Sequence, residues 1–307
     1  MTDTLSPMQA PLQLSQHLAS IVASISRSVV AVHGRAGRMP SSGIVWQPGL
    51  AVSAEETVER DTDLALTLPD GSLVEATLVG RDPSTDIAVL RFAAAGSAAP
   101  APVGSGPFAS DPRPGHLAVA VGRSGGDVIA ALGIVSLAGA AWRSSQGGLI
   151  DARLRIDARL PIVAEGGALV AADGRLIGMS VFGPRRRLLA IPAATIDRTV
   201  QAIGDKGHIA RGYLGVGLQG VPLAAADGAE ARRAAMVVTI DPAGPAKTAG
   251  ILQGDIIVAL GGAPVTGLRS LYRQLGPDTV GRSTSIELIR AGASTTVDVI
   301  IAARPRA

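Results

Sequence analysis

The chain has 307 residues, of which 47% are apolar but only 2% aromatic, and its formal net charge is +3. This length is sufficient for two ordinary domains, each with a core of Val, Ile, Leu and Ala. The charge is too small to indicate nucleic-acid binding. The absence of cysteine excludes disulfides and thiolate-based metal sites. Since the four histidines are dispersed, we expect no metal and no cofactor.

Residues 1–13 are polar and contain prolines, and we expect them to be disordered. They show no basic segment followed by an apolar one, so no signal peptide is visible. No stretch approaches the roughly 18 uninterrupted apolar residues of a membrane span. As written, the sequence predicts a cytoplasmic protein without a membrane span. If the true start lay upstream, the protein could instead be exported to the periplasm.

Residues 14–26 carry apolar side chains at helical spacing. Short β-type segments bounded by turn residues follow them. We expect strands at residues 29–32, 42–46, 64–68, 73–79, 87–92, 117–121, 128–135, 149–156, 167–170, 176–181 and 188–191. Residues 93–110 are mostly Ala, Gly, Pro and Ser, which predicts a loop. This rhythm is typical of a pair of β-barrels or a β-sandwich.

The order of predicted strands and helices changes near residue 204, which predicts a domain boundary. We expect a helix from Pro192 to Ile203, because a proline begins it and Gly204 follows it. Residues 205–211 are predicted to be a linker. From residue 212 onward, strands alternate with short helices. The predicted domains are therefore residues 14–204 and residues 212–307.

Three segments of the first domain carry a family resemblance. They read IDARLPIVAEGGALV (residues 156–170), GLAVSAEETVERDTDLALTLPDG (49–71) and GRDPSTDIAVL (80–90). These segments resemble the nucleophile loop, the histidine segment and the aspartate segment of the HtrA/DegP family of trypsin-like serine proteases. The resemblance implies a mainly β fold, a chymotrypsin-like double β-barrel.

The same resemblance places the three positions of the catalytic triad at Glu56, Asp86 and Glu165. Such a triad needs a hydroxyl nucleophile and an imidazole that accepts and returns its proton. The two glutamates supply neither group. The family has glycine in the oxyanion loop where this chain has Val163, and a β-branched residue resists the backbone angles that glycine tolerates. We therefore expect no functional catalytic residue.

Two interpretations of these positions remain open. In the first, Asp86 and the pair Gly166–Gly167 persist because strands and turns require them. In the second, the three carboxylates converge in the old cleft, where like charges raise one another's pKa or recruit a cation.

Two segments of the second domain are similar to the PDZ domain of the same family. They read KGHIARGYLGV (residues 206–216) and AGILQGDII (residues 249–257). The resemblance implies a loop whose backbone N–H groups bind a carboxylate, followed by an edge strand to which a peptide can add. A basic side chain beside the loop and a helix at residues 268–275 would complete the groove. The predicted peptide-binding residues are Arg211, Tyr213, Leu214, Gly215, Val216, Leu268, Leu271 and Leu275.

The function predicted from these observations is binding. An inactive HtrA-like protein would capture peptides, protein C-termini or unfolded proteins through its PDZ domain. One alternative is an active HtrA-type serine endopeptidase in protein quality control. Another is a chaperone-like scaffold that assembles as a homo-oligomer or with active relatives. Family members commonly form trimers through N-terminal aromatic contacts, but residues 1–28 contain no Phe, Tyr or Trp.

Overall fold

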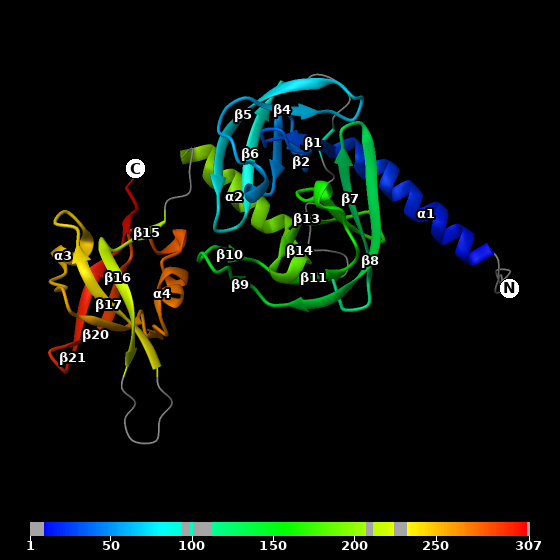
Figure 1. Cartoon of the computed structure of the whole chain (residues 1–307). Coiled ribbons are helices and arrows are strands. Elements are labelled where there is room, and N and C mark those ends of the chain that lie inside the picture. Colours follow the sequence, from blue (N-terminus) through cyan, green and yellow to red (C-terminus); the bar gives the residue numbers. More distant parts are fainter. Residues whose placement is uncertain (1–8, 94–98, 101–111, 207–210, 224–231, 306–307) are drawn as a thin grey trace. The chain divides into compact units, whose positions relative to one another are not determined.

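The computed structural model describes residues 9–93, 99–100, 112–206, 211–223 and 232–305 (Figure 1). The chain divides into two compact units. Unit 1 comprises Met1–Trp142 and Ile150–His208, and unit 2 comprises Arg143–Leu149 and Ile209–Ala307. Residues 1–8, most of the predicted 93–110 loop and residues 207–210 of the predicted linker lie outside the described residues.

Unit 1 contains two closed antiparallel barrels. Barrel 1 has the strand order β1–β2–β3–β6–β5–β4, and barrel 2 has the order β11–β14–β13–β12–β7–β8. The strands of barrel 1 are β1 Val29–His33, β2 Ser41–Gln47, β3 Leu50–Ser53, β4 Leu64–Thr67, β5 Leu73–Asp82 and β6 Ile87–Phe92. Those of barrel 2 are β7 Leu117–Ser124, β8 Asp127–Gly139, β11 Arg153–Asp157, β12 Ala168–Ala171, β13 Leu176–Gly183 and β14 Arg187–Pro192. The predicted double barrel is confirmed.

Aliphatic side chains fill both barrels, because alternate residues of each strand point inward. Val30, Leu66 and Leu90 belong to the core of barrel 1, and Leu169 and Ile177 to that of barrel 2; each is at most 1% exposed. Burial of such surface stabilises the fold by about 25 cal/mol per Å². The scarcity of aromatic residues is therefore compensated by many fully buried branched side chains.

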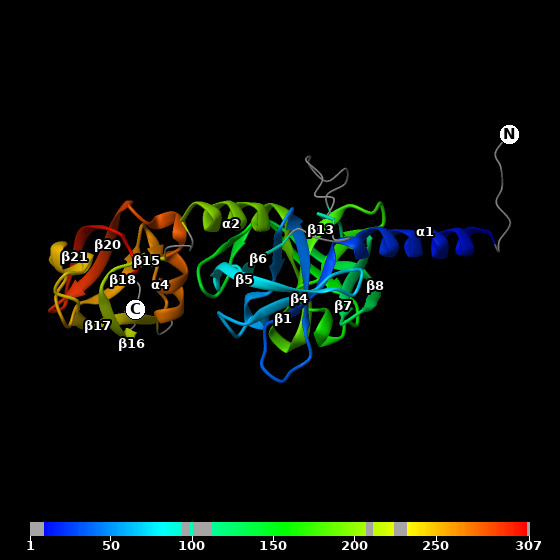
Figure 2. The ribbon, with the colours of Figure 1, turned by 90° about the horizontal axis from the view of Figure 1, so that it is seen from above.

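Two α-helices flank the barrels (Figure 2). Helix α1, Gln9–Ile25, buries only Ile21 and Ile25 on unit 1, and most of its length extends away from the barrels. Helix α2, Ala193–Lys206, packs against β5, β6, β13 and β14. The indole N–H of the buried Trp46 donates to the carboxylate of Asp197 on α2 at 2.7 Å.

The structure differs from the predicted elements at both ends of unit 1. Helix α1 begins at Gln9, so residues 9–13, predicted to be disordered, are helical. Pro11 lies in the first turn, where a helix does not need the missing N–H group. At the other end, α2 extends to Lys206, so the first two residues of the predicted linker are helical.

The strand predicted at residues 149–156 is interrupted. It forms β10, Leu149–Ile150, which pairs with β9, Trp142–Arg143, and then β11. Asp151 leaves the strand because its N–H donates to the Thr195 hydroxyl at 3.0 Å and its carboxylate accepts from that hydroxyl at 2.7 Å. This polar contact with α2 competes with the sheet and ends β10.

Unit 2 contains a sheet in the order β16–β17–β18–β20–β21, with β19 paired to β18, and a separate pair β15–β22. Its strands are β15 Gly212–Tyr213, β16 Val216–Leu223, β17 Arg232–Ile240, β18 Ile256–Leu260, β19 Ala263–Pro264, β20 Ser283–Arg290, β21 Ala293–Ile300 and β22 Ala302–Ala303. Its helices are α3 Pro245–Thr248 and α4 Leu268–Gln274. Asp255, 2% exposed, pairs with Arg290 at 2.7 Å and fixes the turn before β18.

Short 3₁₀ turns complete both units. They are η1 Ser26–Ser28, η2 Glu55–Thr57, η3 Ile162–Ala164, η4 Pro184–Arg186 and η5 Pro277–Thr279. Of these turns, η2 contains Glu56 and η3 immediately precedes Glu165, two of the predicted triad positions. Among the helices that the structure describes, none has the length and apolar character needed to cross a membrane.

Candidate functional sites

The three predicted triad positions lie together in unit 1. Glu56 is on η2, Asp86 immediately precedes β6, and Glu165 follows η3. The N–H of Glu56 donates to the Asp86 carboxylate at 3.1 Å. The side chains of Glu56 and Glu165 are hydrogen-bonded to each other. The two barrels thus bring three carboxyl groups together.

Glu165 is built into the loop rather than presented to solvent. It is only 3% exposed, and its carboxylate accepts the N–H of Phe182 at 2.9 Å. Its carbonyl oxygen accepts the N–H of Ser42 on β2 at 2.8 Å. These contacts tie the loop of barrel 2 to barrel 1 and keep the Glu165 side chain buried.

Burial shifts the acidities of this cluster. It raises the pKa of Asp86 to about 7, although the N–H of Glu56 opposes the shift, and the neighbouring glutamates add to it. Burial, together with the carboxyl group of Glu56 and against the effect of the Phe182 N–H, also raises the pKa of Glu165 to about 7. The cluster therefore retains protons near neutral pH, which is how two carboxyl groups can share a hydrogen bond.

None of the described histidines belongs to the cluster. Of the described histidines, His33 is bonded to the Thr67 hydroxyl at 2.8 Å and His17 to the carbonyl of Ala172 at 2.7 Å. His116 lies beside the N–H of Arg113, and His208 is outside the described residues. Within the described part of the chain, no group of three or more His, Cys, Asp or Glu residues is arranged to hold a metal ion.

The hydroxyl groups closest to the loop serve as structural contacts. The Ser42 hydroxyl donates to the carbonyl of Val163 at 2.8 Å, and the Ser53 hydroxyl donates to the carbonyl of Ser42 at 2.7 Å. The Ser180 hydroxyl lies 3.1 Å from the carbonyl of Gly167. Each of these groups is buried and engaged with the backbone, so none is presented as a nucleophile.

The oxyanion loop is a closed 3₁₀ turn. Val163 lies within η3, where the N–H of Ala164 donates to the carbonyl of Pro161 at 3.0 Å. The N–H of Glu165 donates to the carbonyl of Ile162 at 3.1 Å. An oxyanion hole requires such N–H groups to point at the reacting oxygen. Here the N–H of Glu165, at the predicted nucleophile position, is already donated to a carbonyl group within the turn.

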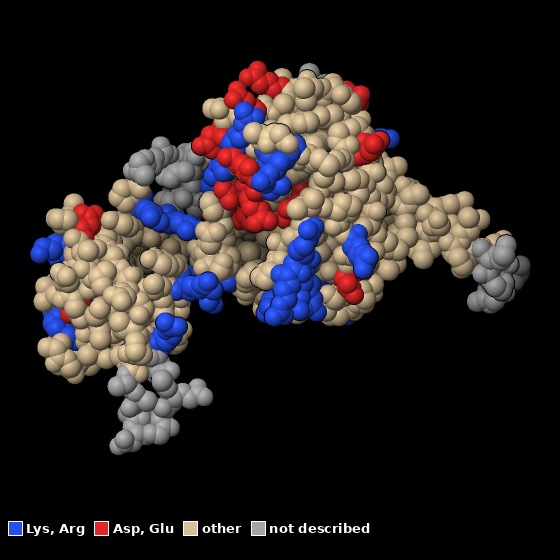
Figure 3. Space-filling model, viewed as in Figure 1, with Lys and Arg blue, Asp and Glu red and all other residues tan. Residues whose placement is uncertain are grey.

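Charged side chains surround η2 on the surface. Figure 3 shows acidic residues and arginines interleaved over barrel 1. Arg81 pairs with Glu55 at 3.1 Å, and Arg35 pairs with Glu59 at 3.3 Å. Because these pairs are partly exposed, each contributes little to stability. Glu55 of the first pair lies in η2, next to Glu56.

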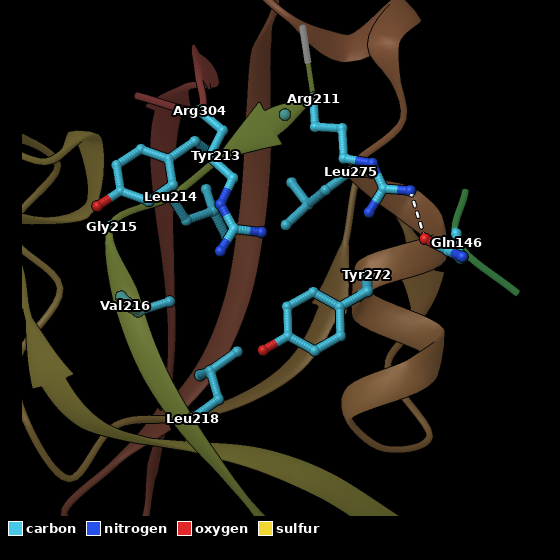
Figure 4. A pocket seen from close by; sticks show the side chains of 11 residues that line it. Gln146, Arg211, Tyr213, Leu214, Gly215, Val216, Leu218, Tyr272, Leu275 and Arg304 are labelled. Atoms are coloured by element: carbon cyan, nitrogen blue, oxygen red, sulfur yellow. Dashed lines mark hydrogen bonds between the residues drawn. The ribbon is translucent and has the colours of Figure 1, made fainter. Parts of the chain in front are cut away.

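The second predicted site is a cavity of about 170 Å³ in unit 2 (Figure 4). It is lined by Gln146, Arg211, Gly212, Tyr213, Leu214, Gly215, Val216, Leu218, Tyr272, Leu275 and Arg304. Six of the eight predicted peptide-binding residues are in this lining. The other two, Leu268 and Leu271, are not: Leu271 is fully buried in the core, and Leu268 packs against that core.

The loop from Tyr213 to Val216 directs N–H groups toward the cavity. The carbonyl of Leu214 accepts the N–H of Ala246 at 2.8 Å, and the carbonyl of Gly215 accepts the N–H of Asp241 at 2.8 Å. In a trans peptide the N–H points away from its carbonyl. The N–H groups of Gly215 and Val216 therefore point away from these partners, toward the free edge of β16.

Glycine is required in this loop. Gly215 has a φ of +75°, a region that residues with a side chain rarely adopt. A Cβ atom there would lie 2.9 Å from the Cα of Gly244. The Tyr213 hydroxyl donates to Asp241 at 2.8 Å and braces the loop from outside. The glycine and the Tyr213–Asp241 hydrogen bond thus fix the conformation of the loop.

Five lining residues were not among the predicted peptide-binding residues: Gln146, Gly212, Leu218, Tyr272 and Arg304. Tyr272 of α4, 51% exposed, and Leu218 of β16 form opposite walls (Figure 4). Arg304 follows β22 and also lines the cavity. Arg211, predicted to contact a ligand carboxylate, donates to the side-chain oxygen of Gln146 at 2.8 Å.

Comparisons with known proteins agree with this architecture. A family model described as a trypsin-like peptidase domain matches residues 41–179, and one described as a PDZ domain matches residues 212–301. The probable periplasmic serine endoprotease DegP-like protein of Bartonella henselae is 31% identical over 275 residues, or 86% of this chain and 53% of that protein. The periplasmic serine endoprotease DegP of Escherichia coli is 29% identical over 261 residues, 82% of this chain and 54% of that protein.

Solved structures show the same fold. The serine endoprotease from Yersinia pestis superimposes with a TM-score of 0.69 and 26% identity, covering 94% of this chain and 98% of that one. The HtrA-type protease AlgW with a decapeptide, 24% identical, has a TM-score of 0.69 and covers 94% and 99% of the two chains. The chain spans about half the length of the curated relatives it matches.

The fold and the two sites define a trypsin-like peptidase domain followed by a PDZ domain. The chain belongs to the HtrA/DegP family of such proteins.

Proposed function

We propose that this chain binds peptide C-termini through its PDZ domain and that its protease domain does not cleave them. The observation that carries the binding function is the loop Tyr213–Val216, whose carbonyl groups are held on one side so that its N–H groups face the cavity on the other. Inactivity rests on the buried carboxyl group of Glu165 at the nucleophile position. Relatives are named serine endoproteases, and cleavage is the alternative that the tests below address.

Binding would begin at the loop. A terminal carboxylate accepts hydrogen bonds from the N–H groups of Gly215 and Val216, and the peptide adds to the edge of β16 as a further strand. Its last side chain enters the apolar part of the cavity, between Leu218 and Leu275. The carboxylate fixes orientation, and the apolar contact contributes about 25 cal/mol per Å² before the costs of ordering.

The experiment measures binding of a library of fluorescent heptapeptides, in free-acid and amidated forms, to the full chain. We expect the free acids to bind and the amidated peptides to bind weakly, because amidation removes the anion and leaves the loop N–H groups poorly paired. Gly215→Ala should weaken binding by about tenfold or more, because alanine disfavours by about 1–3 kcal/mol the left-handed conformation that directs the loop N–H groups toward the cavity.

Gly250→Ala is the matched control for this measurement. Gly250 has the same φ of +75°, but a Cβ atom there would meet nothing within 4 Å, and it does not line the cavity. Equal affinity for free-acid and amidated peptides would show that internal segments are bound instead. If no peptide binds, the binding function is wrong.

A second experiment tests inactivity. We expect the wild-type chain to leave casein intact and to resist fluorophosphonates, which label activated serines.

Glu56→His with Glu165→Ser rebuilds the triad beside Asp86, but the closed η3 turn still uses the N–H of residue 165. Adding Val163→Gly should raise casein turnover by roughly 10²-fold, the effect of one oxyanion donor. Equal turnover by the double and triple variants would contradict the role given to Val163, and turnover by the wild type would establish the endopeptidase alternative.

Localisation and assembly are part of the same proposal. The relatives are named as periplasmic proteins, which supports the periplasmic alternative, and the cytoplasmic expectation finds no support among them. Assembly with active relatives would let the PDZ domain deliver bound chains to a competent protease. This scaffold function predicts that the chain suppresses aggregation of an unfolded substrate only together with an active relative.

A further inference from the structure

Two arginines face each other at the mouth of the PDZ cavity. Strands β15 and β22 are antiparallel, with Gly212 opposite Ala303 and Tyr213 opposite Ala302. One step further, the N–H of Arg304 donates to the carbonyl of Arg211 at 2.8 Å, so these two residues are also directly opposite. Like charges at such a pair destabilise a sheet unless an anion lies between or beside them.

The described residues provide little to balance these charges. The lining of the cavity includes both arginines but no Asp or Glu. The nearby carboxylate of Asp241 accepts hydrogen bonds from the Tyr213 hydroxyl and from the N–H of Ala243, at 2.8 and 3.0 Å. The guanidinium of Arg304 has no hydrogen-bond or ion-pair acceptor in the described part of the chain. In Figure 4 it extends past Tyr213 toward Leu214, at the end of the cavity formed by the loop.

A terminal carboxylate accounts for only part of this site. It carries one negative charge, and it is already bound by the N–H groups of Gly215 and Val216. Two guanidinium groups beside it leave an excess of positive charge. A ligand with a second carboxylate close to its end would balance both arginines and relieve their repulsion.

We propose that the cavity selects peptide C-termini with Asp or Glu at the penultimate position, and that Arg304 is the residue that binds this second carboxylate. The proposal rests on the proposed binding function. Side chains of an extended peptide alternate in direction. When the last side chain enters the apolar cavity, the penultimate one points out of it, within reach of the long Arg304 side chain at the carboxylate end.

The test begins with a free-acid heptapeptide library, randomised at its last three positions and selected on the full chain. We expect wild type to enrich Asp and Glu at the penultimate position and Arg304→Gln to lose this enrichment. Arg304→Lys keeps a positive charge and should keep part of the preference. Arg282→Gln is the matched control, because Arg282 is exposed in the same unit and does not line the cavity.

A defined pair of peptides then measures the contact. For one selected sequence, changing the penultimate Glu to Gln should weaken binding to wild type by about three- to fivefold, as expected for a partly exposed ion pair. The same change should leave binding to Arg304→Gln unaltered, and the difference on wild type should shrink at high salt.

The outcomes separate the two proposals. Selection of peptides without an acidic preference, or an equal Glu-to-Gln effect on wild type and Arg304→Gln, overturns the role of Arg304 and leaves the binding function intact. Failure to select any peptide overturns both. Because Arg304→Gln could disturb the β15–β22 pair, its affinity for the Gln peptide is measured too: unchanged affinity shows that the site is still formed.

Discussion

Replacing Gly166 with alanine is expected to destabilise unit 1 by about 4 kcal/mol or more, the range reserved for severe core defects. Gly166 has a φ of +84°, and a Cβ atom there would lie 2.2 Å from the carbonyl oxygen of Ser42 and 2.7 Å from the Ser53 hydroxyl. The N–H of Ser42 itself donates to the carbonyl of Glu165 at 2.8 Å. The added methyl group would therefore push apart the contact that joins the two barrels.

Gly174→Ala separates the clash from the backbone strain. Gly174 has a nearly identical φ of +81°, but the nearest atom to its added Cβ would be 3.8 Å away. We expect this variant to lose only about 1–2 kcal/mol, the cost of a left-handed residue. Urea denaturation of the full chain, with the transition of unit 1 resolved, measures both losses. Equal losses of stability in Gly166→Ala and Gly174→Ala would mean that the contact between the barrels shifts at little cost to accommodate the methyl group.

Replacing Glu165 with glutamine is expected to stabilise unit 1 at alkaline pH. Burial and the carboxyl group of Glu56 hold the pKa of Glu165 at about 7 in the folded chain, against an ordinary value of 4.5. Between these values the folded chain keeps a proton that the unfolded chain has lost. The free energy of unfolding of wild type therefore falls as pH rises from about 4.5 to about 7 and then stays level.

Glutamine reproduces the protonated acid, because its oxygen can still accept the Phe182 N–H while its amide donates to Glu56. Glu165→Gln should thus match wild type near pH 4 and exceed it by on the order of 2–3 kcal/mol at pH 8. A shallower pH dependence should remain, because burial also raises the pKa of Asp86. Glu75→Gln, at an exposed residue of β5, should change little. Parallel pH profiles for wild type and Glu165→Gln would show that folding does not raise the pKa of Glu165.

Local sequence motifs were sufficient to locate the main segments that form the two sites. The segments around Glu56, Asp86 and Glu165 were assigned from family patterns, and the structure brings these residues together through η2, the start of β6 and η3. The loop Tyr213–Val216 was predicted in the same way. In each case, the residues that define the position are close to one another in the sequence.

The features that were missed depend on distant contacts. The interruption at Asp151 requires Thr195 on α2, which no local pattern near β10 contains. On α4, the spacing of Leu268 and Leu271 indicated an apolar face but not its direction; that face packs inside, and Tyr272 lines the cavity. Arg304 reaches the cavity only because β22 pairs with β15, some 90 residues earlier in the chain.

The position of the aromatic residues makes the two units optically distinct. Both tryptophans of the chain, Trp46 and Trp142, lie in unit 1, and both tyrosines, Tyr213 and Tyr272, lie in unit 2. Trp46 is 3% exposed and hydrogen-bonded to Asp197, so its fluorescence will shift to longer wavelength when unit 1 opens. Tyrosine absorbance will report unit 2, and Tyr272 will report ligand as well. One unlabelled sample can therefore follow the unfolding of each unit, and peptide binding, without any added probe.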